Sequence, residues 1–492
     1  MPGAWPHPRS SRVPSASIAS RLTIVTTRSS LHRDGPVDHT ALFTKNGNKI
    51  IWHEGFTNLN FFGFAQLICP TAQAWIRYTL PQRLSHSRRS KVRLLLVPQP
   101  QHTRCSVMGN AQMEKHIRTT HVGSLPRNAK LTDLLIRQEL GDVVDSAELE
   151  LQISRGVHEV LRHQVEAGVD IVSDGEQSKP GFQTYVAQRM TGFAGESRRR
   201  VATDFIKFPA YAEMMRTKIG RRAKVTNAPQ AVGDVTYHGQ RDALADCDRL
   251  RRELGEIDSG HGAFMTAPSP GIIATTLLNA HYDSHERYLF TLAQEMRKEY
   301  EIIHKAGFIL QVDAPDLAME RTVFFQDNSD AEFVSFVEMH VEAINKATAD
   351  IPPAAMRVHC CWGNREGPHV DDIPLAKILP ELLQLRAQTL SIELANPRHQ
   401  HEYESIRAAQ WPSDKTLIPG VIDSTTNYVE PAQVVANRIL QAVTAVRDHT
   451  RVIAGVDCGF GTFAGYEMVA SDVVWAKLRA LREGADLAAK SL

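Results

Sequence analysis

From residue 117 onward, short apolar stretches alternate with longer segments whose apolar residues recur at helical spacing. The segments 149–168 and 285–307 place apolar residues at positions i, i+3, i+4 and i+7, which predicts amphipathic helices. Both segments end in Ala-Gly, and the glycine predicts a C-terminal cap before the next strand. The stretches between such segments are short and β-rich, which predicts strands at 117–123, 169–174, 224–233, 261–268, 308–315, 356–363, 389–395, 417–423 and 452–458.

This alternation predicts an α/β fold built as a single (β/α)8 barrel, or TIM barrel. Eight or nine strand–helix units over about 375 residues suit one barrel better than an open sheet. The surplus strand and the Arg-rich stretch 190–222 are predicted insertions, and the strands within 224–268 are expected to include a hairpin. Catalytic residues of such barrels lie at the carboxyl ends of the strands. Polar residues do lie at or just after the predicted strand ends: Ser124, Glu176, Asp313, His359, Cys361, Glu393, Asp423 and Cys458.

The net charge of +1 hides an uneven distribution of charge along the chain. Residues 1–112 contain 14 Lys and Arg against 3 Asp and Glu, so the rest of the chain carries the acidic excess. The basic stretch is rich in Ser and Arg, as transit peptides are, but its early prolines break any helix. We therefore expect residues 1–112 to be a basic N-terminal extension that is disordered or foreign to the functional protein. Residues 113–492 are expected to form the barrel domain.

Composition argues against several classes of protein. The apolar fragments of the extension are too short to span a bilayer, so we expect no membrane partner. The acidic barrel argues against a nucleic-acid partner, which would depend on the extension alone. Six cysteines in 492 residues, without a secretory signal, do not suggest a disulfide framework. We expect a cytoplasmic location, or a mitochondrial one if the extension is real, and leave the oligomeric state open.

Four residues at predicted strand ends form a complete ligand set for one Zn²⁺. His359 and Cys361 follow one strand, Glu393 follows the next and Cys458 follows the last. Nitrogen, sulfur and oxygen donors of this kind suit tetrahedral zinc. Three anionic ligands would make the metal electron-rich, which favours activation of a substrate thiol over formation of hydroxide from water. The alternative for each cysteine is a small, buried apolar residue.

Seven short motifs carry a resemblance to a known family. They are THVGSLPR (120–127), SDGEQ (173–177), QVDAP (311–315), HCCWGN (359–364), SIELAN (391–396), PGVIDS (419–424) and VDCGFGT (456–462). With them, residues from about 115 to 486 resemble the C-terminal catalytic barrel of the cobalamin-independent methionine synthase family. The resemblance implies a zinc site made of His359, Cys361, Glu393 and Cys458. It also implies that an amino-acid substrate contacts Gly123, Ser124, Glu176 and Asp313.

The chain departs from the family pattern in three ways. It has one barrel where the synthase has two similar halves. Thr425 stands where the family has a histidine proposed to act as an acid, and no tryptophan of the folate site is found around 266–276. The sequence is therefore closer to a short, single-barrel branch, which also contains zinc alkyltransferases such as epoxyalkane:coenzyme M transferase.

Together these features predict an enzyme that transfers a methyl or related alkyl group to a small thiol. The reaction would resemble that of 5-methyltetrahydropteroyltriglutamate–homocysteine S-methyltransferase in methionine biosynthesis, with zinc, a thiol such as homocysteine, and a methyl or alkyl donor. Asp423 and His121 are the candidate acid or proton relay. Alternatively, Asp423 caps a loop and His121 is a satisfied core histidine. Alkyl transfer from an epoxide, a zinc lyase or hydrolase, and a metal-free barrel related to uroporphyrinogen decarboxylase remain alternative functions.

Overall fold

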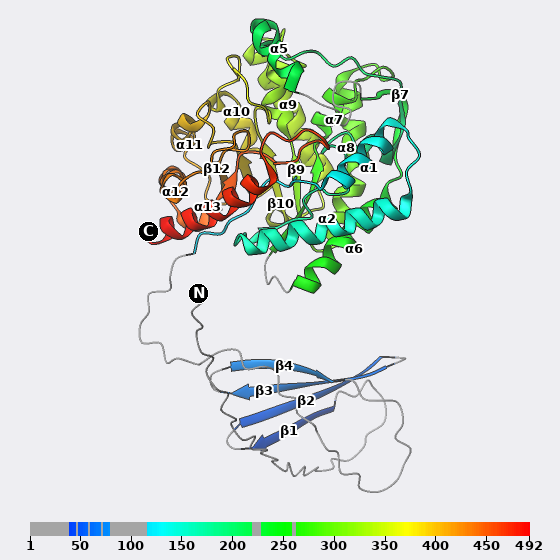
Figure 1. Ribbon diagram of the computed structural model, residues 1–492. Coiled ribbons are helices and arrows are strands. Elements are labelled where there is room, and N and C mark those ends of the chain that lie inside the picture. The colour runs from blue at the N-terminus through cyan, green and yellow to red at the C-terminus, as the bar shows by residue number, and fades with distance from the viewer. Residues whose placement is uncertain are drawn as a thin grey trace, which may run out of the picture. The chain divides into compact units, whose positions relative to one another are not determined.

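The structure is a computed structural model that describes residues 116–218, 228–257 and 262–492, together with four strands before residue 79. The chain divides into two compact units, Met1–Ser106 and Val107–Leu492. The first unit contains an antiparallel sheet whose strands follow sequence order (Figure 1): β1 (His39–Lys45), β2 (Asn48–Thr57), β3 (Asn60–Cys69) and β4 (Ala72–Tyr78). These strands depart from the disorder that we expect for residues 1–112. The rest of that stretch, including its predicted boundary, lies outside the described residues.

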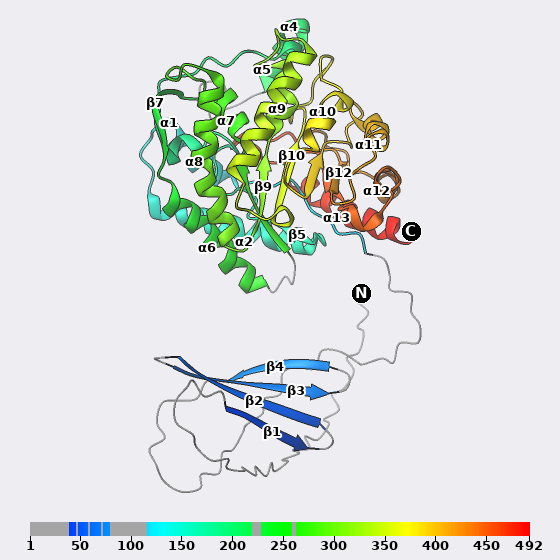
Figure 2. The same cartoon turned by 180° about the vertical axis from the view of Figure 1, so that it is seen from behind.

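The second unit is built around a curled sheet of seven parallel strands (Figures 1 and 2). In sheet order these are β13 (Gly455–Val456), β12 (Thr416–Ile422), β11 (Thr389–Ile392), β10 (Met356–Cys360), β9 (Ile309–Asp313), β8 (Gly262–Pro268) and β5 (Ile171–Val172). The predicted strand at 117–123 appears as two parallel bridges. Thr120 pairs with Ile171 at one edge of the sheet, and Thr119 pairs with Ala454 beside the other. The predicted α/β class with a parallel sheet is confirmed.

Amphipathic helices cover the outer face of this sheet (Figure 2). The two helices predicted from periodicity are α2 (Ser146–Glu166) and α8 (His285–Lys305). Each is followed by a glycine with positive φ, Gly168 at 78° and Gly307 at 88°, as their predicted capping role requires. The other helices of the cover are α1 (Ala129–Leu140), α6 (Gln240–Ile257), α7 (Pro270–Thr276), α9 (Asp330–Ala347), α10 (Leu375–Leu382), α11 (Tyr403–Ala408), α12 (Ala432–Val446) and α13 (Ser471–Ala489).

An insertion follows β5 and differs from the prediction. The strand expected at 224–233 corresponds to β7 (Gln230–Tyr237), which pairs with β6 (Met190–Ala194) and not with a strand near residue 262. Along β7 buried and exposed positions mix, as in an antiparallel strand with a solvated face, whereas β8 ends in five consecutive buried residues. The predicted hairpin between the strands of 224–268 is therefore wrong, because β7 pairs with β6. Between β6 and β7 lie α4 (Thr203–Lys207) and α5 (Pro209–Lys218).

The inward-facing residues of the parallel sheet form layers. A small apolar cluster fills the lower layer: Ile171, Phe264, Ile418 and Ile453, with Ile309 packed against it. Above it, Thr266, Gln311 and Arg357 are register partners on β8, β9 and β10. Above these lie Asp313 and His359, again in register, at the carboxyl ends of their strands. Among the described residues, none of the helices is long and apolar enough to cross a membrane.

Candidate functional site

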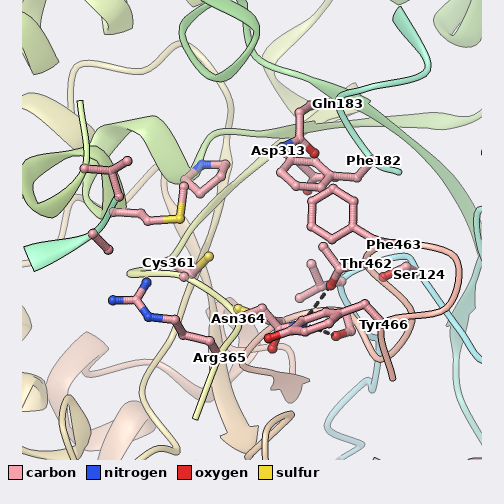
Figure 3. A pocket seen from close by; sticks show the side chains of 18 of the residues that line it. Ser124, Phe182, Gln183, Asp313, Cys361, Asn364, Arg365, Thr462, Phe463 and Tyr466 are labelled. Atoms are coloured by element: carbon pink, nitrogen blue, oxygen red, sulfur yellow. Dashed lines mark hydrogen bonds between the residues drawn. The ribbon is translucent and has the colours of Figure 1, made fainter. Parts of the chain in front are cut away.

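A cavity of about 290 Å³ opens at the carboxyl ends of the parallel strands (Figure 3). Its lining comes from loops that follow at least four of these strands and from the insertion after β5. Six of the predicted site residues line it: Ser124, Glu176, Asp313, His359, Cys361 and Cys458. Strand ends that are distant in sequence therefore converge at this cavity.

Three of the four predicted metal ligands form a tight cluster. One ligand atom each from His359, Cys361 and Cys458 lies within 4.8 Å of the others, and all three residues are buried. The Nδ1 atom of His359 is buried without a hydrogen-bond partner in the described part of the chain. A hydrogen bond from Cys458, together with the neighbouring His359, lowers the pKa of the Cys361 thiol to about 5. One imidazole and two thiols, one of them readily ionised, fit a soft divalent cation such as zinc.

Glu393, the fourth predicted ligand, is not part of this cluster. One of its carboxylate oxygens binds the guanidinium of Arg398, with Nε at 2.9 Å, and the other accepts the backbone N–H of Trp362 at 3.1 Å. Arg398 also donates to the carbonyl of Gly363 at 2.9 Å. The carboxylate is thus held beside Cys361 by an arginine that we did not predict. Arg398 follows Glu393 by five residues in the same strand-end loop, and this spacing could have indicated the pair from the sequence.

Asn364 joins the two loops that carry the cysteines. Its Nδ2 donates to the carbonyl of Gly459 and to the hydroxyl of Thr462, both at 2.7 Å (Figure 3). The glycines of the second loop are needed for close packing, since a Cβ on Gly459 would lie 2.0 Å from the Ser124 hydroxyl oxygen. This loop therefore shapes the backbone beside Cys458 and fixes its distance from Cys361.

Glu176 and Asp313 also line the cavity, and Asp313 lies in register with His359 on the neighbouring strand. Glu176 has φ of 55°, an uncommon value for a non-glycine residue, which indicates that the surrounding structure holds it in place. Its Oε1 accepts the hydroxyl of Thr266 at 2.7 Å, while its Oε2 is buried without a partner among the described residues. Burial, and then the nearby Glu176 carboxylate, raise the pKa of Asp313 to about 7. Two adjacent carboxylates of this kind favour a cationic ligand.

Gly123 permits this arrangement. Its φ is 142°, and a Cβ there would lie 2.6 Å from Thr266 Cγ2 and 2.9 Å from Glu176 Oε1. Glycine at this position lets the Thr266 and Glu176 side chains meet. Gly123 itself is not among the residues that line the cavity, so its contact with an amino-acid substrate stays a prediction.

The outer part of the cavity is apolar and was not predicted. The rings of Phe182 and Phe463 lie side by side, with centroids 5.9 Å apart (Figure 3). The insertion contributes Val201, Phe205 and Met215. The arginines among the lining residues are each ion-paired, Arg199 with Glu320, Arg200 with Asp327 and Arg365 with Asp204. The cavity lining therefore combines apolar side chains with ion-paired arginines.

His121 does not face the cavity, contrary to its predicted role as an acid or relay. Its Nε2 lies 2.7 Å from Gln164 Oε1, its Nδ1 accepts the N–H of Gly123 at 3.2 Å, and its ring packs edge-on against Phe264. Burial lowers the pKa of His121 to about 3, so the ring stays neutral at physiological pH. This is the alternative of a satisfied core histidine.

Asp423 also lies outside the cavity lining. Its carboxylate accepts the backbone N–H and hydroxyl of Thr425, at 3.0 and 2.9 Å, and the hydroxyl of Thr426. Burial alone would raise the pKa of Asp423, but the hydrogen bonds from Thr426 and Thr425 lower it below its usual value. An ionised carboxylate that closes a turn is a poor proton donor, and the structure favours the loop-capping alternative.

The buried His121 should make the protein sensitive to acid. The unfolded chain has a histidine pKa of about 6.5, whereas His121 in the folded protein stays neutral down to about 3. The unfolded state therefore binds more protons in this window, and the free energy of unfolding should fall as the pH drops from 6.5. The free energy of unfolding, measured by urea unfolding at several pH values between 7.5 and 5, should change less with pH for His121→Gln than for the unmodified protein. An equal pH dependence of the two proteins would contradict the assignment of His121 as a neutral core histidine.

Comparison with known proteins decides the family. A model of the catalytic domain of cobalamin-independent synthase matches residues 117–241 and 264–481. The chain belongs to this family. Methionine synthases of Sulfurisphaera tokodaii and Saccharolobus solfataricus are each 24% identical to it, over 343 and 379 residues. These matches cover 69% and 76% of this chain and 85% and 95% of the two relatives.

Solved structures confirm the fold of this family member. A B12-independent methionine synthase from Shewanella sp. W3-18-1, in complex with selenomethionine, has a TM-score of 0.57 at 20% identity and covers 76% of this chain and 98% of its own. A putative vitamin-B12-independent methionine synthase from Listeria monocytogenes has a TM-score of 0.50 at 18% identity, with coverage of 75% and 98%. The predicted family resemblance is confirmed by the match of the family model to residues 117–241 and 264–481.

Proposed function

We propose that this family member is a zinc-dependent transferase that moves a methyl or related alkyl group onto the thiol of a small substrate such as homocysteine. The family and the methionine synthases among its relatives support methyl transfer to a thiol. The observation that carries the proposal is the cluster of His359, Cys361 and Cys458, with ligand atoms within 4.8 Å, in a cavity that also holds two carboxylates.

His359, Cys361 and Cys458 would hold the metal, and we propose Glu393 as its fourth ligand. The donor set fits zinc, as does the buried His359 Nδ1 that has no partner in the described part of the chain. Zinc, when bound, lowers the pKa of a coordinated substrate thiol and holds it as a thiolate. Arg398 holds Glu393 beside the cluster and offsets its negative charge.

The remaining residues of the cavity bind and orient the substrates. Glu176 and Asp313 would accept the ammonium group of an amino-acid thiol, and Ser124 also lines the cavity. Phe182, Phe463 and the insertion would enclose the donor and exclude water. In the transfer, the acceptor sulfur loses its proton and forms a bond to the alkyl carbon, while the bond from that carbon to the leaving group breaks. Orientation of the two reactants in one enclosed site accounts for several powers of ten in rate.

The structure supports two further parts of this proposal. The bridges of Thr119 and Thr120 at the two edges of the sheet support an eighth strand that closes it into a (β/α)8 barrel. Thr425, bound to Asp423, takes the position of the family's histidine, which favours an alkyl donor other than the folate used by the full-length synthase. The proposal therefore includes both a methyl donor and an epoxide-type alkyl donor. The cytoplasmic location remains a prediction.

Zinc content and zinc K-edge absorption of the full chain test the proposal. We expect about one zinc per chain with two sulfur ligands, rising to three when homocysteine is added, because the substrate thiol joins the metal. An unchanged spectrum with homocysteine would redirect the search to other thiols. A chain without zinc would overturn the proposal and return Cys361 and Cys458 to the role of buried apolar residues.

A further inference from the structure

Two buried cations lie behind the carboxylates of the cavity. Lys179 and Arg357 are 3% and 2% exposed, and neither forms an ion pair with Glu176 or Asp313 in the described part of the chain. A buried charge is costly unless neighbouring groups satisfy it. One neutral residue links each cation to a carboxylate, and this arrangement needs a functional or structural reason.

The first cation reaches Glu176 through Thr266. Lys179 Nζ donates to the Thr266 carbonyl at 2.6 Å and to its hydroxyl oxygen at 3.0 Å. The Thr266 hydroxyl then donates its single proton to Glu176 Oε1 at 2.7 Å. Because an ammonium group can only donate, its contact fixes the direction of the threonine proton. Glu176 is thus held by Oε1 alone, and its Oε2 is left for another donor.

The second cation reaches Asp313 through Gln311. Arg357 Nε donates to Gln311 Oε1 at 2.6 Å, which obliges the amide nitrogen of Gln311 to point the other way. That nitrogen donates to Asp313 Oδ1 at 2.6 Å and to the carbonyl of Val122. Arg357 is further held by the hydroxyl of Thr120 and lies over the ring of Phe264, 3.4 Å from its centroid.

We call each of these chains of hydrogen bonds, from a buried cation through a neutral residue to a carboxylate, a relay. Both relays pass through one layer of the sheet. Thr266, Gln311 and Arg357 are direct register partners on β8, β9 and β10, one layer below Asp313 and His359. Interior layers of such barrels are dominated by branched apolar residues. A polar layer here supports the site above it. Direct pairs between each cation and its carboxylate would neutralise the carboxylates, whereas the neutral spacers orient them and leave one oxygen of Glu176 unpaired.

We propose that Thr266 and Gln311 are positioning residues that hold Glu176 and Asp313 for the ammonium group of the acceptor, so that the enzyme selects α-amino thiols over thiols without an amino group. This inference deepens the proposed function and rests on it. The chemistry follows from the two carboxylates, which face the same cavity as the metal-ligating atoms. A thiol without an ammonium group would leave Glu176 Oε2 buried and unpaired.

Binding of two thiols to the zinc-loaded chain tests the inference. The probes are homocysteine and 4-sulfanylbutanoate, which differ by the amino group alone, and affinity is measured by calorimetry. The unmodified protein should bind homocysteine about 10- to 100-fold more tightly, as expected for charge-assisted hydrogen bonds to a buried carboxylate. In Thr266→Val, which keeps the shape but loses the hydroxyl, this ratio should fall at least about fivefold. The affinity for 4-sulfanylbutanoate and the zinc content should not change.

Further variants separate the relay from general damage. Gln311→Met should lower the ratio independently, and Thr266→Ser, which restores the hydroxyl, should restore it. Thr348→Val is the matched control: Thr348 is equally buried, but its hydroxyl binds only the carbonyl of Ile344 on α9. An unchanged ratio in folded Thr266→Val and Gln311→Met would overturn the relay. Equal affinity of the unmodified protein for both thiols would overturn the ammonium site but not thiol transfer. Binding of neither thiol would overturn this inference by excluding both as acceptors, whereas a chain without zinc would overturn the proposed function as well.

Discussion

Cys361→Ala should lose the bound zinc and reduce alkyl transfer by well over 100-fold. Replacement of residues that merely support metal ligands already costs about 10- to 100-fold in affinity or activity, and Cys361 would be a ligand itself. Its thiol lies within 4.8 Å of the ligand atoms of His359 and Cys458, so its loss would leave only two of the three clustered ligand atoms. Zinc content by mass spectrometry and transfer of a labelled methyl group measure the two effects.

Cys360→Ala is the matched control for this variant. The two cysteines are adjacent, but successive side chains of a strand point to opposite faces, and Cys360 packs in the hydrophobic core. We expect Cys360→Ala to keep its zinc and its activity while it loses about 1–2 kcal/mol of stability. Retention of zinc in Cys361→Ala, or equal loss in both variants, would contradict the assigned site.

Gly123→Ala should weaken productive binding of the acceptor at least about 10-fold while zinc is retained. An alanine here would need φ near 142°, and its Cβ would lie within 2.6 Å of Thr266 and 2.9 Å of Glu176. The Glu176 carboxylate must then move, and loss of an oriented, charged hydrogen bond of about 1.5–3 kcal/mol predicts at least a 10-fold rise in KM. Steady-state kinetics over a range of homocysteine concentrations measure this rise.

Gly141→Ala provides the control for backbone strain. Gly141 also has positive φ, 89°, at the C-terminal cap of α1, but no atom lies within 4 Å of its added Cβ. The variant should lose about 1 kcal/mol of stability, the usual cost of a non-glycine residue in the left-handed region, and keep its KM. If both glycine variants raised KM equally, general strain and not displacement of Glu176 would be the cause.

The candidate site was predictable in part because the carboxyl ends of parallel strands lie at the same edge of a sheet. Cys458 lies about 100 residues after His359 and Cys361, yet the β/α alternation places all three at one end of the sheet. The same rule was too coarse for Asp423 and His121, which also lie at strand ends. The carboxylate of Asp423 turns into the loop formed by Thr425 and Thr426, and His121 turns towards Gln164. Strand ends set where a residue lies, and packing sets where its side chain points.

The insertion shows a second limit of sequence patterns. The stretch 224–233 has the composition of a strand, and β7 does form there in part. Its partner β6 lies about 40 residues earlier, within the Arg-rich stretch where we predicted no strand. Strand pairing depends on cross-strand contacts that single-strand periodicity does not encode.

The sequence by itself determined the α/β class, the parallel strands and their helices, the family, and the residues that we propose as metal ligands. These features depend on local periodicity and on residue chemistry, which are written along the chain. Only the tertiary structure decided that Glu393 binds Arg398, that Asp423 and His121 turn away from the cavity, and that Lys179 and Arg357 stand one residue behind Glu176 and Asp313. Each of these contacts depends on which distant side chains form hydrogen bonds or ion pairs with a buried polar group. Burial makes such contacts important, because an unpaired polar group costs more free energy inside the protein than in water.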